Sequence, residues 1–372
     1  MNKKILLIAP FLNLLGHNAG GKSSVVLKYI DFYIEKNNEV YIFPIKEDFR
    51  EFFTWKHKER NIKILPTRGL KGSLGNIKSL VQNFCLNKSY ISSLINGEHN
   101  KFVDAFKNDF DIVHSLYTSS NYNNFLIDIV PKNVKKISTY YHGPSKKYHK
   151  NDLNIFISKD QKYKYSPDNG VVIYPPVLNS KSTNSKLDIK NDYIVFIGVI
   201  EPRKRLYLLL QALKIVKNKF PFKLLIIGSE HYDLNYYSKC YEYAKLNDLN
   251  VEFKGFISED KKLSYISSDN CKGMFMPSSI EGFGIAYIEC FLKRVRCIGY
   301  DKVINDFNST FNENLGVPFD GDNNNPDDLA KCILEFQNNY LKPIPENVIT
   351  DIEKKFSLEY FKKQLNEEIF NT

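Results

Sequence analysis

The sequence predicts an α/β protein made of two doubly wound domains, and three observations support this fold class. Short apolar runs recur along the chain, and most are followed by a segment whose apolar residues have helical spacing. This strand–helix series occurs twice, on either side of a polar stretch at 179–192 with the composition of a linker. At 372 residues the chain exceeds the length at which one hydrophobic core stops growing. We therefore expect two parallel sheets, with a ligand in a central cleft lined by the carboxyl ends of their strands.

The composition narrows the class of protein. Hydrophobic residues make up 43% of the chain, which allows a substantial core, and no apolar run approaches the ~20 residues that span a bilayer. The first nine residues contain a short apolar run without the cleavage site of a signal peptide, so we expect a strand there rather than a signal peptide. Six cysteines without paired spacing predict neither a zinc site nor a disulfide framework, and favour the cytoplasm. The net charge of +10 is compatible with a polyanionic partner. It is equally well explained by a Lys- and Asn-rich composition that is unrelated to any partner.

The first predicted unit begins with a strand, a glycine-bearing loop and a helix. The strand is expected at 5–9, the helix at 23–35 and the next strand at 39–44. Gly20 and Gly21 lie in the loop before the helix. Such a loop can bring a phosphate to the backbone N–H groups of a helix N-terminus.

The same loop matches the phosphate-loop pattern of nucleoside triphosphatases. Gly16–Ser23 reads Gly-His-Asn-Ala-Gly-Gly-Lys-Ser. The true motif follows its strand directly, whereas residues 11–15 intervene here, and no later strand clearly ends in a magnesium-binding aspartate. An NTPase is therefore the lesser alternative.

Polar residues at further strands of the first half have two readings each. Asp109 and Asp111 resemble an Asp-x-Asp metal site, but they precede their strand, whereas ligands gather at carboxyl ends, so we interpret them as structural. His114, near the carboxyl end of the strand, is better placed for function, but we favour its interpretation as a hydrogen-bonded core histidine. His142 follows a strand predicted at 135–141, and either ligand contact or loop packing explains it.

The second half begins with a strand at 193–197 that ends at Gly198. Arg203 and Lys204 follow just before a helix, where cations suit a phosphate group, although a solvated basic surface is the alternative. Further strands are predicted at 223–227, followed by Gly228, at 251–253, followed shortly by Phe256, and at 296–298.

The stretch 274–298 carries the most informative pattern. It reads as a strand, a glycine-bearing turn and an apolar helix, with Glu281 before the turn and Glu289 within the helix. Acids in apolar runs need partners, and a helix start suits a phosphate or a sugar hydroxyl. The other candidate residues of this turn are Ser279, Gly282, Phe283 and Gly284.

These residues resemble a known enzyme family. Glu281-Gly-Phe-Gly, with Glu289 eight positions on, is similar to the signature of the retaining family-4 glycosyltransferases, which have two Rossmann-like domains (GT-B type). The pieces Glu-Pro-Arg-Lys and Tyr-Pro-Pro-Val are most similar to bacterial polysaccharide mannosyltransferase-like members. The likeness continues in order through Gly20-Gly21, 110–114, His142-Gly143, 173–177, 198–204, 227–229 and 253–256.

The resemblance implies the roles of the candidate residues. The donor would be a nucleoside-diphosphate sugar, with GDP-mannose as one candidate, and no metal or other cofactor is expected. Glu289 would accept hydrogen bonds from the ribose, Glu281 and the backbone of Phe283 and Gly284 would hold the sugar, His142 would touch it, and Phe256 would border the base. The acceptor hydroxyl would attack from the leaving-group side and pass its proton to the donor phosphate.

The chemistry of the candidate residues agrees with this role. A leaving nucleoside diphosphate needs its charge neutralised, which Arg203, Lys204 and the N–H groups near Gly20 and Gly21 can do. Two departures from the family pattern are Val199, where many members have Arg, and the basic segment 291–296, which could face an anionic acceptor.

The resemblance also sets the expected organisation. We expect an acceptor domain at 1–178, a donor domain at 179–350 and a helix at 351–372 that packs back across the domains. A glycan or lipid-linked glycan would be the acceptor, with its specificity in 49–108, and the enzyme would be cytoplasmic, in peripheral contact with an anionic inner membrane face. No nucleic-acid partner is expected. A catalytically idle sugar-nucleotide or glycan-binding protein of the same fold is the main alternative.

Overall fold

The chain forms two compact units, each with its own parallel sheet. Unit 1 comprises Met1–Pro175 and Phe361–Thr372, and unit 2 comprises Pro176–Tyr360. The predicted fold class, two parallel-sheet α/β units of Rossmann type, is confirmed. The computed structural model describes residues 2–9, 21–44, 53–65, 109–116, 127, 130–140, 151–165, 170–177 and 191–371.

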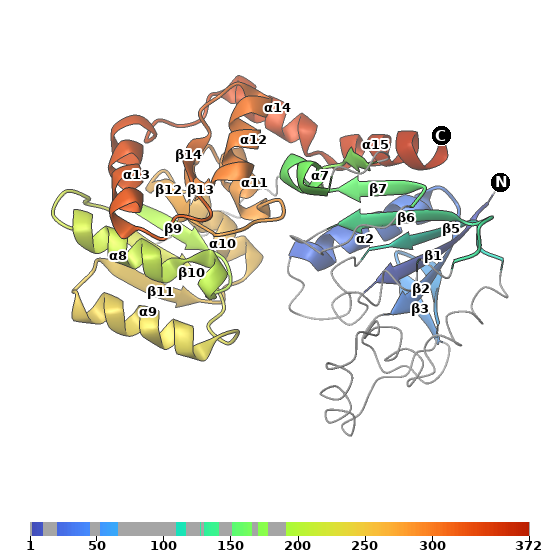
Figure 1. Ribbon diagram of the computed structural model, residues 1–372, viewed down its shortest axis with the longest axis horizontal. Helices are drawn as coiled ribbons and strands as arrows, with labels where there is room; N and C mark the ends of the chain where they lie inside the picture. The colour runs from blue at the N-terminus through green and yellow to red at the C-terminus, as the bar shows by residue number, and fades with distance from the viewer. Residues whose placement is uncertain are drawn as a thin grey trace. The chain divides into compact units, whose positions relative to one another are not determined.

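Unit 1 is built on an eight-stranded sheet with the order β3-β4-β2-β1-β5-β6-β7-β8 (Figure 1). Its buried strands are apolar, which is typical of a parallel sheet covered on both faces. The helices described in this unit are α2 (Gly21–Glu35), α7 (Lys159–Tyr165) and most of α15 (Leu358–Phe370). The strands are β1 (Lys4–Ala9), β2 (Glu39–Pro44), β3 (Phe53–His57), β4 (Arg60–Ile64), β5 (Ile112–Ser115), β6 (Lys135–Tyr140), β7 (Leu153–Phe156) and β8 (Gly170–Val172).

The edge of this sheet is an antiparallel hairpin that the sequence did not predict. Strands β3 and β4 pair through a turn at Lys58 and Glu59, which have φ of 46° and 61°. Hairpin turns with positive φ usually contain Gly or Asn, so no turn signal marks this one. The buried carboxylate of Asp31 on α2 holds the turn, accepting hydrogen bonds from His57 Nε2 at 2.8 Å and Lys58 Nζ at 2.7 Å.

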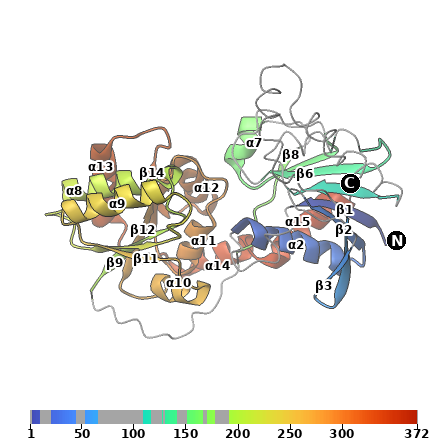
Figure 2. The same cartoon turned by 90° about the horizontal axis from the view of Figure 1, so that it is seen from below.

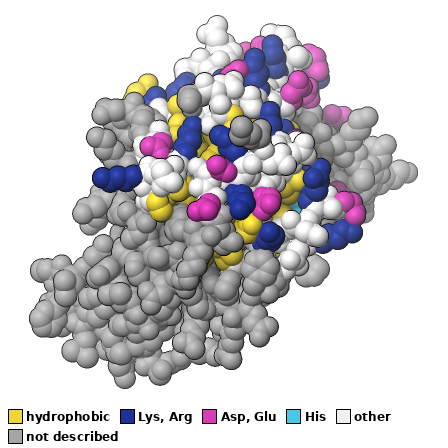
Figure 3. All heavy atoms as spheres, turned by 90° about the vertical axis from the view of Figure 1, so that its right-hand side faces the viewer, with side chains coloured by type: hydrophobic (Ala, Val, Ile, Leu, Met, Phe, Trp, Pro, Cys, Tyr) yellow, Lys and Arg dark blue, Asp and Glu magenta, His cyan; other side chains and the backbone are white. Residues whose placement is uncertain are grey.

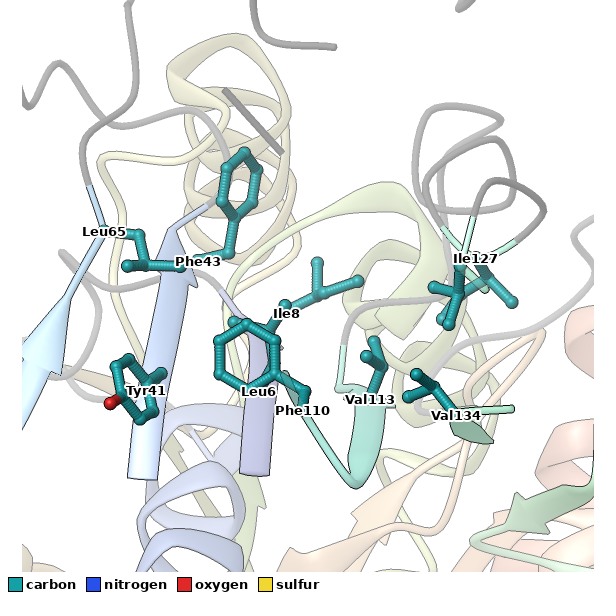
Figure 4. Packing of buried hydrophobic residues seen from close by; sticks show 10 residues of the cluster. Leu6, Ile8, Tyr41, Phe43, Leu65, Phe110, Val113, Ile127 and Val134 are labelled. Atoms are coloured by element: carbon teal, nitrogen blue, oxygen red, sulfur yellow. The ribbon is translucent and has the colours of Figure 1, made fainter. Parts of the chain in front are cut away.

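The two faces of the first sheet are covered differently. One face carries a cluster of buried apolar side chains, shown in Figure 4, that comes from β1, β2, β5 and the segments around them. On the other face, α15 packs on α2, with Phe361 against Tyr29 at 5.2 Å and Phe370 against Phe32 at 5.8 Å between ring centroids. The last helix therefore returns to unit 1, although the segment directly before it, residues 176–357, belongs to unit 2.

The polar residues of β5 and its approach are structural, as predicted. His114 is fully buried and hydrogen-bonded to Tyr33 Oη and Thr139 Oγ1, both at 2.8 Å. Burial lowers its pKa to about 3, so the ring is neutral. Asp111 accepts a hydrogen bond from the Lys4 N–H at 2.7 Å and Asp109 has a φ of 49°, so both acids shape the entry to the strand.

Unit 2 is built on a six-stranded parallel sheet with the order β11-β10-β9-β12-β13-β14. The order reverses direction between β9 and β12, which is the switch point where ligands of such sheets bind. Helices α8 and α9 lie on one side of the sheet and α10 on the other (Figure 2). The strands are β9 (Tyr193–Ile197), β10 (Lys223–Ile227), β11 (Val251–Gly255), β12 (Cys271–Met276), β13 (Cys297–Tyr300) and β14 (Gly316–Phe319).

The helices of unit 2 begin and end where the sequence has capping residues. Asn325 caps α13 by accepting from the Asp327 N–H at 3.0 Å, and α13 packs on α8. The helices are α8 (Leu206–Val216), α9 (Leu234–Leu246), α10 (Glu259–Ile266), α11 (Ile285–Leu292), α12 (Asp301–Phe311), α13 (Pro326–Asn339) and α14 (Glu346–Lys355).

The basic segment that follows α11 holds neighbouring backbone. Arg294 donates to the Ile344 carbonyl at 3.2 Å and pairs with Glu346 at 2.8 Å. Arg296 is buried, donates to the Lys342 and Asn314 carbonyls, and pairs with Glu313. Both arginines are thus used to fasten the connection between α13 and α14.

The described surface gives no sign of a membrane span. Among the described helices, none has both the length and the apolar character needed to cross a bilayer. On the described part of the face drawn in Figure 3, Lys and Arg side chains are interspersed with Asp and Glu.

We expect Phe361→Ala to destabilise unit 1. The Phe361 side chain is 1% exposed, and its removal leaves a cavity against α2, which costs about 3–5 kcal/mol. Thermal unfolding and amide exchange in α2 measure the loss. Lys363→Ala, on the exposed side of the same helix, is the control, and equal behaviour of the two variants would contradict the packing of α15.

Candidate functional site

The candidate site lies at the carboxyl ends of β9 and β12, which are neighbours in the sheet of unit 2. Gly198 directly follows β9, and its N–H donates to the Ile227 carbonyl at 3.0 Å. A Cβ on Gly228 would overlap the carbonyl of Gly198, so this close approach of two strand ends requires glycine at 228. The Lys204 side chain passes over Gly198, with Cε 3.5 Å from the position of a Cβ there.

The two predicted phosphate-binding cations sit on a single 3₁₀ turn, Pro202–Lys204, between β9 and α8. This turn is fastened to the loop after β12, because the Ser279 N–H donates to the Arg203 carbonyl at 2.9 Å and Arg203 Nη1 donates to the Ile280 carbonyl at 2.9 Å. The fold therefore brings together two segments that are about 75 residues apart in the chain.

Glu281 joins these two segments by charge. Its Oε1 forms an ion pair with Lys204 Nζ and lies 3.4 Å from Arg203 Nη1. The side chains of Glu281 and Lys204 are only 9% and 12% exposed, whereas Arg203 is 40% exposed and also pairs with Glu201 at 2.5 Å. The buried acid that the sequence left without a partner is thus neutralised by the predicted cations.

The turn after Glu281 needs its second glycine. Gly284 has a φ of +77° and precedes α11, and a Cβ there would clash with the ring of Tyr287. Tyr287 is fully buried, and its Oη donates to the Met276 carbonyl at 2.8 Å and accepts from the Tyr300 N–H at 3.1 Å. One hydroxyl thereby joins the ends of β12 and β13 beneath the turn.

The remaining predicted residues of the turn divide between core and surface. Phe283 is 3% exposed and packs edge-to-face on Phe307 and Phe356, so its side chain belongs to the core. Gly284 is the N-cap residue of α11 and has no side chain to cap the helix, so within the described residues the N-terminus of α11 follows Glu281 without a side-chain cap. Phe256, after β11, has a side chain that is 70% exposed, as a residue that borders a ligand can be.

Glu289, predicted to meet the ribose, already has an ion-pair partner. Lys262 Nζ on α10 lies 2.8 Å from Glu289 Oε2 and 2.6 Å from a carboxylate oxygen of Glu259. Burial raises the pKa of the Glu289 carboxyl, and the charge of Lys262 opposes that rise. Lys262 could not be singled out from the sequence, because a lysine in a polar helix carries no signal by itself.

Arg205 is a second residue that the sequence analysis did not single out. It adopts a left-handed conformation with φ of 56° at the start of α8, and its buried guanidinium donates to the carbonyls of Asp320, Gly321 and Asn323. A Cβ on Gly321 would lie 2.5 Å from the Ser279 carbonyl, so the turn that Arg205 holds packs directly behind the site loop. Arg205 is therefore used structurally and is not available to a phosphate.

The part of the chain that carries the candidate site matches a known protein family. The family model described as Glycosyl transferases group 1 matches residues 179–354, which is nearly all of unit 2. Residues 179–354 are thus similar to the group 1 glycosyltransferases. The predicted enzyme class, a glycosyltransferase, is thereby confirmed. A comparison with curated protein sequences gave no match.

Solved glycosyltransferase structures share the fold over the whole chain. Sucrose-phosphate synthase from Thermosynechococcus elongatus is 16% identical, with 98% of each chain covered and a TM-score of 0.69. The lipopolysaccharide outer core galactosyltransferase WaaB is 18% identical, with 99% of each chain covered and a TM-score of 0.67. Anabaena HepE in complex with UDP-glucose is 13% identical, with 100% of each chain covered and a TM-score of 0.66. These likenesses confirm the predicted GT-B fold.

Some predicted site residues of the glycosyltransferase lie outside the described part of the chain. These are His142 and Gly20, and with them most of the Gly16–Ser23 loop, whereas Gly21 is the first residue of α2. Within the described residues, no group of three or more His, Cys, Asp or Glu side chains is arranged to hold a metal ion.

We expect Tyr287→Phe to destabilise the site without changing its shape. Loss of the hydroxyl removes the acceptor of the buried Tyr300 N–H and one of the two donors to the Met276 carbonyl, which also accepts from the Ser278 N–H, at a cost of about 1–3 kcal/mol. Chemical denaturation monitored by circular dichroism measures this cost. Tyr241→Phe, on an exposed part of α9, is the matched control, and an equal stability for both variants would contradict the bridging role.

Proposed function

We propose that the protein is a retaining glycosyltransferase that moves a sugar from a nucleoside-diphosphate sugar to a hydroxyl of a glycan or lipid-linked acceptor. The observation that supports this most is the pair of cations, Lys204 and Arg203, held by Glu281 at the switch point of the second sheet. The start of α11 follows Glu281, and its N-cap residue, Gly284, provides no side-chain cap. This combination suits a diphosphate that gains negative charge as it leaves.

The proposed reaction needs no protein nucleophile. The bond between the anomeric carbon and the β-phosphate oxygen breaks, and the acceptor oxygen bonds to that carbon on the same face. The acceptor proton passes to a phosphate oxygen of the leaving nucleoside diphosphate. Lys204 has three N–H donors and Arg203 five, so both can bond phosphate oxygens while they remain near Glu281. We propose that these cations neutralise the leaving group without a metal ion.

The nucleoside is proposed to lie between α11 and the end of β11. Glu289 would accept hydrogen bonds from the ribose hydroxyls, and exposed Phe256 would border the base. The HepE structure contains UDP-glucose, which supports a uridine donor, whereas the sequence resemblance to mannosyltransferase-like members favours GDP-mannose. UDP-glucose and GDP-mannose are therefore the first two donors to test.

A donor panel followed by product analysis tests the proposal. A sugar nucleotide that binds the folded protein raises its thermal unfolding midpoint, and the donor found in this way is then incubated with and without glycan acceptors. NMR of the product gives the anomeric configuration, which should be that of the donor. Inverted configuration would contradict the retaining mechanism, and binding without transfer or hydrolysis would indicate an idle binding protein.

We expect Lys204→Met and Glu281→Gln to reduce kcat about 10²–10³-fold, because each removes a charge that acts on the leaving group or holds its partner. Initial rates at saturating donor measure the effect. Lys217→Met, whose side chain is exposed at the end of α8, is the control and should keep the wild-type rate. Unchanged turnover in the Lys204 variant would exclude its proposed role.

Donor affinity is expected to fall in mildly acidic solution. Burial raises the pKa of Glu289, so its carboxylate begins to protonate at a higher pH than an ordinary glutamate, and the protonated form is a poorer acceptor for ribose hydroxyls. Affinity should therefore be full well above this raised pKa and decrease as the pH falls through it. Calorimetry with UDP or GDP between about pH 5 and 8 measures this pH dependence of the affinity. Glu289→Gln should remove the part of it that comes from Glu289.

A further inference from the structure

We propose that Lys262 is a positioning residue that makes the site selective for ribonucleotides, by holding the carboxylate of Glu289 toward the sugar hydroxyls of the nucleoside. This inference rests on the proposed function, because it concerns the ribose part of the same donor site. It assigns a role to a residue of α10, a helix that otherwise contributes no predicted site residue.

The geometry of the ion pair leaves half of the carboxylate for a ligand. Lys262 Nζ lies 2.8 Å from Glu289 Oε2. Within the part of the chain that the structure describes, no hydrogen bond or ion pair is made to the other oxygen, Oε1. The Glu289 side chain is 15% exposed, so a ligand can approach it although it is mostly buried. Lys262 thus fixes one oxygen and leaves the second as an acceptor.

Lys262 is itself held in place. Its side chain is 14% exposed, and its Nζ also forms an ion pair with Oε1 of Glu259, one turn earlier on α10, at 2.6 Å. Two carboxylates share this cation, but the side chain of Glu259 is 63% exposed and that of Glu289 is 15% exposed, so water screens the pair with Glu289 less and this pair alone can hold the lysine. Without Lys262, Glu289 would lie buried and unpaired, with the negative charge of Glu259 nearby, and would rotate toward solvent or take up a proton.

A positioned carboxylate distinguishes a ribose from a deoxyribose. It accepts hydrogen bonds from both the 2′- and 3′-hydroxyls when it is ionised and aimed at them. A deoxynucleotide lacks one of these donors and leaves the buried carboxylate partly unsatisfied, which is the situation in which sites discriminate strongly. The size of this discrimination reports directly on how well Glu289 is positioned.

Calorimetry with nucleotides tests the inference in the full chain. The probes are UDP, GDP and their 2′-deoxy counterparts, and the measured quantity is the ratio of the two dissociation constants. We expect a ratio of about tenfold or more for the wild type, and a ratio near one for Lys262→Met. Lys262→Arg should restore most of the ratio, because a guanidinium can keep the charge and the contact.

Two further variants separate positioning from general stability. Lys261→Met, the exposed neighbour of Lys262 on α10, should keep the wild-type ratio. Glu259→Gln removes the competing carboxylate, whose side chain is 63% exposed, and should keep or increase the ratio, which provides a test even if Lys262→Met does not fold. A fall of the ratio in Glu259→Gln, or a wild-type ratio in folded Lys262→Met, overturns the inference.

The outcomes distinguish this inference from the proposed function. If the wild-type protein binds neither UDP nor GDP, the proposed function fails and the inference fails with it. If the wild type binds one of them and prefers the ribonucleotide, but Lys262→Met shows the same preference, then the proposed function stands and only the role of Lys262 is wrong.

Discussion

One buried carboxylate organises the site of unit 2. Glu281 follows β12, and its charge is offset by Lys204 and Arg203 on the turn after β9. Burial of such a group is unfavourable unless its partners are near, so the pairing holds the two strand ends in one arrangement. The same pairing keeps two cations at the edge of the sheet, ready for a more highly charged ligand. Stability of the loop and its proposed chemistry therefore depend on the same contacts.

Close backbone approaches support that carboxylate. Gly228 lets two strand ends meet, because a Cβ there would overlap the Gly198 carbonyl, and Gly321 lies against the loop that carries Ser279. Arg205 holds the turn of Gly321 from the other side through three backbone carbonyls. Since each of these positions leaves little room, the loop has few ways to relax, which is a condition for a preorganised site.

Some charged or ionisable residues have structural roles. His114 is a neutral core residue, as predicted. Arg294 and Arg296, for which the sequence suggested an anionic acceptor, hold the segment before α14. Their role could not be read from residue type, because a polar side chain looks the same in a sequence whether its partners are protein carbonyls or a ligand. Glu281 differs, since its protein partners are cations at the switch point of a sheet, and Glu289 is paired with a lysine of the neighbouring helix α10.

The sequence by itself determined the α/β class, the two units, most strands and the turn with its two glutamates. These features are local: apolar runs, glycines at strand ends and the spacing of Glu281 and Glu289 are visible without knowing the neighbours. Only the tertiary structure decided which charges meet. Lys204 and Glu281 are 77 residues apart and Lys262 and Glu289 are 27 apart, so their pairing depends on the order of strands in the sheet. The hairpin of β3 and β4 escaped prediction for a related reason, because its turn is stabilised by Asp31 of another element rather than by turn residues of its own.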